Sequence, residues 1–376
     1  MRKRILLLIT DLEIGGTPTV VRELATRLND PPRVQIEVAC LGEWGPVAQQ
    51  LATARIPVTP LDAKSTRDFD VANRLVRLLQ RGEFDTCFSF LVHANAVAAG
   101  ASLRCRSVRF IQSIQTTQRD PLWHWHLQSV VQWACEKIVV PSASVARVAR
   151  KWSHVDPKKI VIIPNAVEPG AFVRSTPAVA TAVPRRAGVV RVGFLGRLDP
   201  IKRVQDLVRA MTLLEKRFVL EIFGDGEERV LLGTLVHELG LGDRVTFHGT
   251  IDRPQIAMDQ IDLLVLPSAA EGFGLVLIEA MAAGVPVIGT DVDGIRDVVS
   301  HGENGLLARV RSPGAIAEAI RQINSDVPLR EHIVARGLTE VCERYAWSAV
   351  ILQYRRLLIV KSSRLRIEDR RSDAGE

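Results

Sequence analysis

Two glutamates eight residues apart, with glycines between them, form a chemically unusual segment. Glu271 and Glu279 lie in EGFGLVLIEAMAAGVPVIGTD, residues 271–291. Gly272 and Gly274 predict that a helix begins near residue 274 and leaves Glu271 in the loop before it. Eight residues at helical rise span roughly 12 Å, close to the distance from a ribose to the far hydroxyls of a linked hexose.

Carboxylates accept hydrogen bonds from hydroxyl groups, and Glu279 on a mostly apolar helix needs such donors. The pair could therefore hold the two sugars of one extended ligand, with the amides at the helix N-terminus facing a diphosphate between them. These amides belong to Gly272, Phe273, Gly274 and Leu275. The alternative is a local structural role, because Ser268 and Glu271 match the S-x-x-E capping box.

A second candidate anion site lies in FLGRLDPIKRVQDL, residues 194–207. Arg197 and Lys202 stand five residues apart, between a predicted strand and a predicted helix. A diphosphate leaving group is well served by a planar donor fork and a point charge that neutralise it as the bond breaks. The alternative is a solvated pair of cations.

Glycine turns follow three other predicted strands. Gly15 and Gly16, in TDLEIGGTPTVV, precede a helix and would let the backbone approach an anion. Their spacing is not the G-x-G-x-x-G of dinucleotide sites. Gly224 and Asp225, in FGDG, and the segment HGTI at 248–251 could present backbone groups to a nucleobase. Each of these turns also fits an ordinary connection.

The elements that would position these residues follow an α/β pattern. Strand-length apolar runs alternate with helical segments, which is typical of parallel sheets covered on both faces. Ligands of such sheets bind beyond the C-terminal ends of the strands. The predicted strands are 5–9, 34–41, 85–91, 107–114, 137–142, 191–196, 218–224, 244–249, 262–268 and 285–291; the predicted helices are 19–28, 204–214, 228–240, 274–284 and 347–361.

This pattern runs twice, which predicts two doubly wound, Rossmann-like domains facing a cleft. Residues 161–188 are rich in Pro, Ala and Thr and indicate the interdomain connection. We predict a first domain over 1–170 that binds the acceptor, a linker over 171–187 and a second domain over 188–346 that binds the nucleotide sugar. The charged tail, 362–376, is expected to be disordered.

Composition places the chain among soluble globular proteins, with 47% apolar and 24% charged residues. The N-terminal run MRKRILLLITD indicates a buried strand and not a signal peptide or a membrane span. The five cysteines (40, 87, 105, 135 and 342) form no C-x-x-C pair. They predict reduced core thiols in a cytoplasmic protein, without a disulfide framework or a zinc site.

The positive charge is concentrated in the first half. Residues 1–176 hold 23 Lys and Arg against 15 Asp and Glu, whereas residues 177–376 hold 26 against 27. Such a field favours anionic lipids or acidic substrates, and no nucleic-acid module accompanies it; the alternative is an arbitrary surface charge. Three of the six tryptophans lie with flanking cations in RDPLWHWHLQSVVQWACEK, residues 119–137. This favours peripheral contact with the inner face of the cell membrane, unless the tryptophans pack inward.

The motifs together resemble the retaining glycosyltransferase family 4, whose fold is GT-B. They are the N-terminal GG, VIIPNAVE, GRLDPIK and EGFGLVLIEAMAAGVPVIGTDVDGIRDVV. The resemblance covers nearly the whole chain, and the E-x7-E element with its trailing AMAAGVPVI is highly specific. It implies metal-independent hexosyl transfer from a UDP- or GDP-linked sugar, with retention at the anomeric carbon. The acceptor class is a saccharide or lipid-linked saccharide in cell-surface polysaccharide or glycolipid assembly.

The resemblance also implies residue roles. Glu271 would meet hydroxyls of the donor sugar and Glu279 the ribose. Arg197 and Lys202 would hold the diphosphate, which Gly16 approaches from the other domain. The final helix would cross back to the first domain, packing Trp347 and Tyr354 there.

The sequence departs from the family at one position. Many members carry a histidine in the loop after the strand equivalent to 107–114, where this chain has QSIQTTQRD, with Gln112, Gln115 and Gln118. His93, in FLVHANAV, is the nearest substitute and otherwise a core or surface residue. The DVD at 291–293 resembles a metal-binding D-x-D motif but falls where the family has a plain loop, so we predict no metal.

Two other functions remain open at this point. A nucleotide-sugar epimerase on the same scaffold would need acid–base residues near the sugar, and no such set is evident. A non-catalytic nucleotide-sugar-binding scaffold subunit is compatible with the glutamine-rich loop. Donor hydrolysis or sugar transfer by the pure protein separates it from an enzyme.

Overall fold

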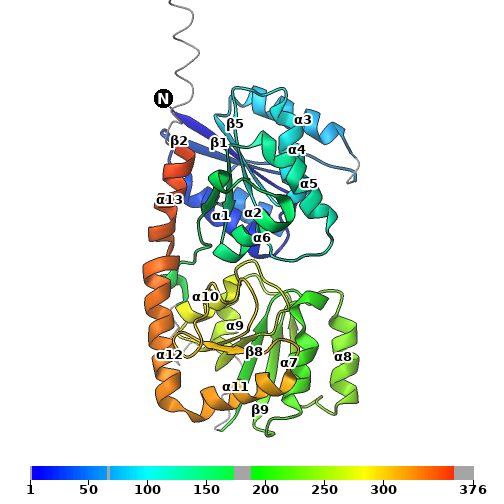
Figure 1. The fold of residues 1–376 in the computed structure, drawn as a ribbon, viewed down its shortest axis with the longest axis vertical. Helices are drawn as coiled ribbons and strands as arrows, with labels where there is room; N and C mark the ends of the chain where they lie inside the picture. The colour runs from blue at the N-terminus through cyan, green and yellow to red at the C-terminus, as the bar shows by residue number, and fades with distance from the viewer. Residues whose placement is uncertain (1, 66–67, 173–187, 360–376) are drawn as a thin grey trace, which may run out of the picture.

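The computed structural model describes residues 2–65, 68–172 and 188–359. The predicted tail and residues 173–187 of the predicted linker lie outside these ranges. Figure 1 shows two α/β bodies stacked along the long axis, with a column of helices along one side. Each body is built on one sheet, and every strand pair in both sheets is parallel.

The first sheet has seven strands in the order β3-β2-β1-β4-β5-β6-β7. Its central strands are almost wholly buried, as expected where helices cover both faces. The strands are β1 (Lys3–Ile9), β2 (Val34–Cys40), β3 (Val58–Pro60), β4 (Thr86–Phe90), β5 (Arg109–Ser113), β6 (Lys137–Val140) and β7 (Ile160–Ile162).

Alternate residues of β1 enter two different hydrophobic cores, because successive side chains of a strand point to opposite faces. Ile5 and Leu7 belong to one core, and Leu6 and Leu8 to the other. The helices of this domain are α1 (Gly16–Leu28), α2 (Pro46–Thr53), α3 (Asp70–Arg81), α4 (Val92–Ser102), α5 (Trp123–Val131) and α6 (Ala143–Ser153).

The second sheet has six strands in the order β10-β9-β8-β11-β12-β13. The strands are β8 (Val190–Leu195), β9 (Phe218–Phe223), β10 (Val245–Gly249), β11 (Leu263–Leu266), β12 (Val287–Thr290) and β13 (Leu306–Ala308). The helices are α7 (Val204–Met211), α8 (Arg229–Glu238), α9 (Pro254–Gln260), α10 (Leu275–Ala282), α11 (Pro313–Ser325) and α12 (Val327–Glu340).

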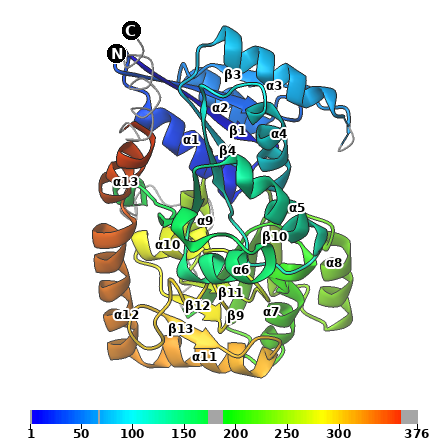
Figure 2. The ribbon, with the colours of Figure 1, turned by 45° about the horizontal axis from the view of Figure 1, so that its top comes forward.

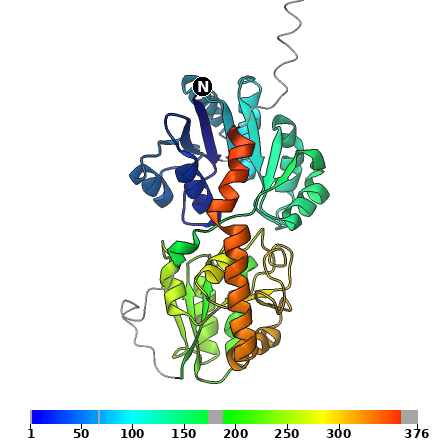
Figure 3. The ribbon, with the colours of Figure 1, turned by 90° about the vertical axis from the view of Figure 1, so that its left-hand side faces the viewer.

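The last helix, α13 (Trp347–Ile359), returns to the first domain, as predicted. Trp347 and Tyr354 are buried in the core that contains β1 and α1. Figures 1 and 3 show α12 and α13 running along both bodies in succession. Two backbone hydrogen bonds, from Val167 to Tyr345 and from Trp347 to Val167, tie the start of this helix to the end of the first domain. The doubly wound two-domain fold is therefore confirmed.

Several local predictions need correction. The first helix begins at Gly16 and not at residue 19, because Pro18 is compatible with a first helical turn. Residues 161–162, assigned to the connection, belong to β7 in the first sheet. Gln112 lies in β5 and is buried, so it is not part of the loop after that strand. Cys342 is exposed, whereas the other four cysteines are buried as predicted.

Candidate functional site

The C-terminal strand edges of the two sheets meet in the structure. Thr117, beyond the end of β5, donates a hydrogen bond of 2.5 Å from Oγ1 to the carbonyl oxygen of Glu271. Ser142, beyond β6, donates one of 3.0 Å from Oγ to the carbonyl oxygen of Gly272. Both acceptors lie in the loop after β11. This loop, where the sequence predicted a ligand, is therefore in direct contact with the first domain.

Glu271 forms an ion pair at the centre of this loop. Its Oε1 lies 2.5 Å from Nζ of Lys202 and accepts a hydrogen bond of 2.6 Å from Oγ of Ser268. The side chain is only 10% exposed. Both contacts fall on Oε1, which leaves Oε2 for a ligand hydroxyl. Ser268 binds the carboxylate directly and no helix starts there, so the capping-box alternative is wrong.

Glu279 lies on the second turn of α10, as predicted, and is buried. Burial raises the pKa of its carboxyl to about 7, although the positive charge of Arg22, from α1 of the first domain, opposes the shift. Arg22 compensates only part of the cost of burying this carboxyl in the empty protein, which favours a ligand-binding role. Helical rise does not apply to the whole segment between the glutamates, because α10 begins at Leu275 and only the second half of the segment is helical.

The two predicted phosphate-binding cations differ in environment. Lys202 ends a short 3-10 helix, Pro200–Lys202, and points to Glu271. Arg197 is 72% exposed and pairs with Asp199 at 2.9 Å. The structure therefore brings Lys202 into contact with Glu271, whereas Arg197 reaches into solvent near the same loop.

The glycines predicted to lie at the site occupy their positions for different structural reasons. Gly15 precedes α1 and Gly16 begins it, and a Cβ on Gly16 would meet open space, as a ligand approach requires. A Cβ on Gly272 would collide with the carbonyl group of Gln115, so this glycine lets the two domains touch. Gly224 has a φ of 133°, and a Cβ there would collide with Gly196. Packing against Gly196 therefore accounts for a glycine at position 224.

The other predicted donor-binding residues lie near the same strand edge. Phe273 is buried and packs edge-on against Tyr345, with ring centroids 5.5 Å apart. Gly274 caps α10 with a φ of 76°. Leu275 is the first helical residue, and Asp225 accepts a hydrogen bond from the amide of Gly226. The side chain of Phe273 is thus a core residue, which leaves its backbone as the part that could face a ligand.

His93 lies in the first turn of α4 and is half-buried beside two rings that the sequence analysis did not assign to the site. Its ring centroid is 5.5 Å from those of both Trp123 and His124. The run WHWH could have signalled a ligand site, because it follows the same strand edge. The sequence alone related its tryptophans to a membrane surface or to inward packing, and not to a ligand.

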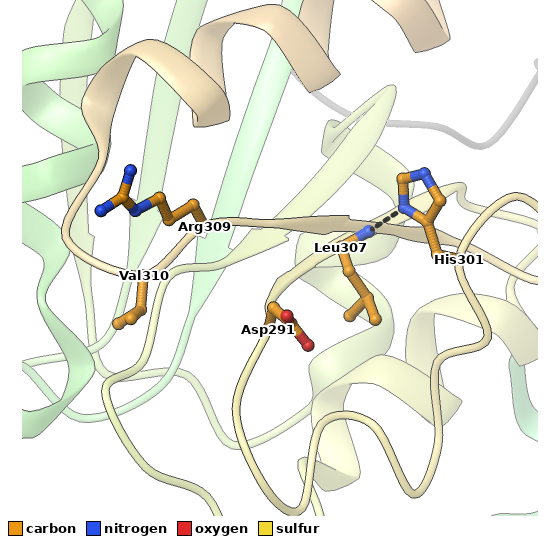
Figure 4. Close-up of a pocket in the computed structure, with 5 residues that line it drawn as sticks. All are labelled: Asp291, His301, Leu307, Arg309 and Val310. Atoms are coloured by element: carbon orange, nitrogen blue, oxygen red, sulfur yellow. Dashed lines mark hydrogen bonds between the residues drawn. The ribbon is translucent and has the colours of Figure 1, made fainter.

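A separate pocket of about 450 Å³ lies where β12 and β13 end (Figure 4). Asp291 and Arg309 line it together with His301, whose Nδ1 accepts a hydrogen bond from the amide of Leu307. Asp291 and Asp293, the outer residues of DVD, both pair with Arg296. Over 2–65, 68–172 and 188–359, no three His, Cys, Asp or Glu residues gather as metal ligands would.

Two family models match consecutive parts of the chain. The model described as Glycosyltransferase Family 4 matches residues 14–170, and the model described as Glycosyl transferases group 1 matches residues 178–339. A phosphatidyl-myo-inositol mannosyltransferase from Mycobacterium leprae is 31% identical over 332 residues, which are 85% of this chain and 83% of that protein.

Other relatives align over shorter stretches. N-acetyl-α-D-glucosaminyl L-malate synthase from Bacillus anthracis is 38% identical over 156 residues, 41% of this chain and 41% of that protein. The chain thus spans about two fifths of the length of this relative and of an uncharacterized glycosyltransferase from Methanocaldococcus jannaschii. Among solved structures, HepE of Anabaena in complex with UDP and glucose superposes with a TM-score of 0.86. The identity is 20%, with 95% of this chain and 99% of that chain covered, so this likeness establishes the GT-B fold alone.

Proposed function

Because the chain belongs to glycosyltransferase family 4, we propose that it transfers a sugar from a nucleoside diphosphate sugar to a saccharide or lipid-linked saccharide, with retention at the anomeric carbon. The observation that carries this proposal is the loop after β11. Its Glu271 pairs with Lys202 and its backbone contacts the first domain, and helix α10, which follows it, carries the buried carboxyl of Glu279. The matched relatives include a phosphatidyl-myo-inositol mannosyltransferase and an N-acetyl-α-D-glucosaminyl L-malate synthase, which supports the same class of reaction.

In this proposal the two glutamates bind the two sugars of the donor. Oε2 of Glu271 accepts a hydrogen bond from a donor-sugar hydroxyl, and the carboxylate of Glu279 accepts them from the ribose. Lys202 lies between Glu271 and the diphosphate and neutralises both, while exposed Arg197 turns from Asp199 to the phosphate oxygens. Gly15 and Gly16 bring the N-terminus of α1 to the diphosphate from the first domain.

The proposed reaction then needs no separate base. The bond between the anomeric carbon and the β-phosphate oxygen breaks, and the acceptor oxygen bonds to the same face of that carbon. The acceptor proton passes to the departing phosphate oxygen, so charge and atoms balance. Lys202 and Arg197 stabilise the negative charge that develops on the diphosphate as the bond lengthens.

The test is nucleotide binding by thermal shift, with UDP, GDP, ADP and dTDP added to the wild-type protein. A shift with one nucleotide that disappears in Lys202→Ala and Glu279→Ala supports the donor site and identifies the base. Lys216→Ala and Glu238→Ala are matched controls, because both side chains are exposed in the second domain. Absence of a shift with every nucleotide would contradict the donor site and favour a scaffold protein that kept the fold and lost the ligand.

We propose that the acceptor is reached at a membrane surface. Trp133 is 55% exposed, with Val130 also exposed, whereas Trp125 is buried. A groove beside Trp133 is lined by Arg106, from the connection between α4 and β5. Exposed apolar side chains next to cations suit an anionic lipid surface. In the part of the chain that the structure describes, no helix is long and apolar enough to span a bilayer.

Vesicle co-sedimentation tests this part of the proposal. The protein should sediment with vesicles of phosphatidylglycerol and phosphatidylcholine but not with phosphatidylcholine alone. Trp133→Ala and Arg106→Ala should each weaken the binding several-fold, since each removes one of the two contributions. Equal sedimentation of the variants and the wild type would contradict this surface.

A further inference from the structure

Three aromatic rings from two helices of the first domain form a compact cluster. His93 is the second residue of α4, and Trp123 and His124 are the first two residues of α5. The ring centroids of Trp123 and His124 are 4.0 Å apart, and each lies 5.5 Å from that of His93. Trp123 nevertheless remains 49% exposed. A large ring held by neighbours but open to solvent offers a preformed face to a ligand.

A buried hydrogen-bond network fixes the two helices that carry the cluster. Asn95 of α4 donates from Nδ2 to Oε1 of Gln128 on α5 at 2.9 Å and to the carbonyl oxygen of Ser113 at 3.1 Å. Its Oδ1 accepts from Oγ of Ser89 at 2.7 Å. Gln128 also donates to Oε1 of Gln112 at 2.8 Å. Satisfied polar networks of this kind specify one arrangement of a core. Figures 1 and 2 show α4 and α5 beside each other.

The cluster lies at the strand edge that faces the second domain. His93 follows β4, and Trp123 follows the loop after the neighbouring strand β5. That same loop carries Thr117, which donates to the carbonyl oxygen of Glu271, and Gln118, whose carbonyl oxygen accepts a hydrogen bond from the indole of Trp125. One continuous loop thus connects the candidate donor site to the ring cluster.

The chemistry of the cluster suits an uncharged polyol. The exposed indole face of Trp123 can stack on the C–H face of a six-membered ring. Burial lowers the pKa of His93. The pKa of His124 is lowered by burial and by the charge of the neighbouring His93 imidazole. Both shifts favour the neutral imidazole, which can donate one hydrogen bond and accept another. Hydroxyl groups need both functions, whereas an anionic group would be better served by charged donors.

We propose that His93, Trp123 and His124 form a binding site for the acceptor, which presents an uncharged pyranose or cyclitol ring to the face of Trp123. This inference rests on the proposed function, because it assigns the acceptor of the same reaction. It makes Trp123 a specificity-determining residue, and it makes Asn95 and Gln128 positioning residues that act through the rings.

The test is fluorine NMR of the full chain labelled with 5-fluorotryptophan. The six tryptophans give six signals, and Trp123→Phe and Trp133→Phe assign two of them. With UDP present, methyl glycosides of glucose, galactose, mannose and N-acetylglucosamine, and myo-inositol, are titrated to about 50 mM, a range suited to weak monosaccharide binding. Glycerol serves as an acyclic control, and Trp133 is the matched exposed tryptophan.

The expected result is a saturable shift of the Trp123 signal with at least one ring compound, without a shift for Trp133 or with glycerol. His93→Ala and His124→Ala should weaken that affinity several-fold. The inference is overturned if Trp123 stays unmoved by every ring compound, or if Trp133 or glycerol responds equally. The thermal shift caused by UDP in the same samples measures binding at the donor site separately. Loss of that shift with a retained Trp123 response would contradict the proposed function and not the ring-binding site.

Discussion

The ammonium group of Lys202 lies 2.5 Å from Oε1 of Glu271, across 69 positions of sequence. The pair is mostly buried, and Ser268 completes it. In the proposed reaction both partners must also meet the donor, so the ion pair holds the empty site in the geometry that the ligand needs.

Lys202→Ala should therefore destabilise the empty protein and weaken nucleotide binding. Removal of the Lys202 ammonium leaves the mostly buried carboxylate of Glu271 with Ser268 as its remaining partner. This should lower the unfolding free energy by about 1–3 kcal/mol. The double variant Lys202→Ala/Glu271→Gln should recover part of that loss. Urea denaturation of the wild type, the two single variants Lys202→Ala and Glu271→Gln, and the double variant measures this coupling, and strictly additive effects would show that the pair is not coupled.

Glu279 should make stability depend on pH. Its folded-state pKa of about 7 lies above its ordinary value of 4.5, so the folded protein retains a proton that the unfolded chain releases. The unfolding free energy should fall as pH rises from 4.5 to about 7, by roughly 3 kcal/mol, and then level off. Glu279→Gln should lack this component in urea denaturation, whereas exposed Glu238→Gln should retain it. An unchanged pH profile in Glu279→Gln would refute the assignment.

Nucleotide affinity should change in the opposite direction over the same interval. Ribose hydroxyls that donate hydrogen bonds require the charged carboxylate, so binding must remove the proton that burial retains. For each pH unit below 7, protonation of the Glu279 carboxyl should lower the nucleotide affinity by about tenfold. Calorimetric titration with UDP, compared between wild type and Glu279→Gln, isolates the contribution of Glu279 from the ionisation of the phosphate.

Gly272→Ala should separate the two domains locally. The new Cβ would collide with the carbonyl group of Gln115, so the loop that carries Thr117 must move from Glu271. Overpacking of this kind costs about 1–3 kcal/mol, and transfer should slow at least about tenfold because the acceptor side is displaced. Gly242→Ala, where a Cβ meets nothing, is the control. Steady-state kinetics measures the effect. An unchanged kcat/KM in Gly272→Ala would show that transfer does not need the contact between Thr117 and Glu271.

Asn95→Ala should lower both stability and acceptor affinity. It leaves the amide of Gln128 and the hydroxyl of Ser89 without their shared partner in a buried site, at a cost of about 2–3 kcal/mol. The exposed amide variant Gln118→Ala should have little effect on unfolding. If Asn95→Ala loses stability but keeps the wild-type KM for the acceptor, the network does not position the ring cluster.

The sequence allowed prediction of features that depend on local backbone chemistry. Glu271 was placed before the helix because Gly274 was expected to mark its start, and a φ of 76° at that residue explains why glycine stands there. The order of strands and helices followed from apolar periodicity. The burial of Glu279 followed from its apolar neighbours along one helix.

Features that depend on tertiary contacts could not be predicted in this way. The Lys202–Glu271 pair joins two separate loops of one sheet. The approach of His93 to Trp123 and His124 depends on how α4 packs on α5. The buried position of Gln112 depends on partners such as Gln128, from another helix, since glutamine on its own indicates a polar surface.

The return of α13 also sets the order in which the chain can complete its fold during synthesis. The second domain is continuous from β8 to α12, whereas the core of the first domain lacks Trp347, Val350 and Tyr354 until α13 has been made. Until then, the apolar surface that these side chains cover stays open on α1 and the sheet. A nascent chain that ends at residue 346 is expected to lose the cooperative unfolding of its first domain and keep that of its second. The domain that leaves the ribosome first is therefore the one that finishes folding last.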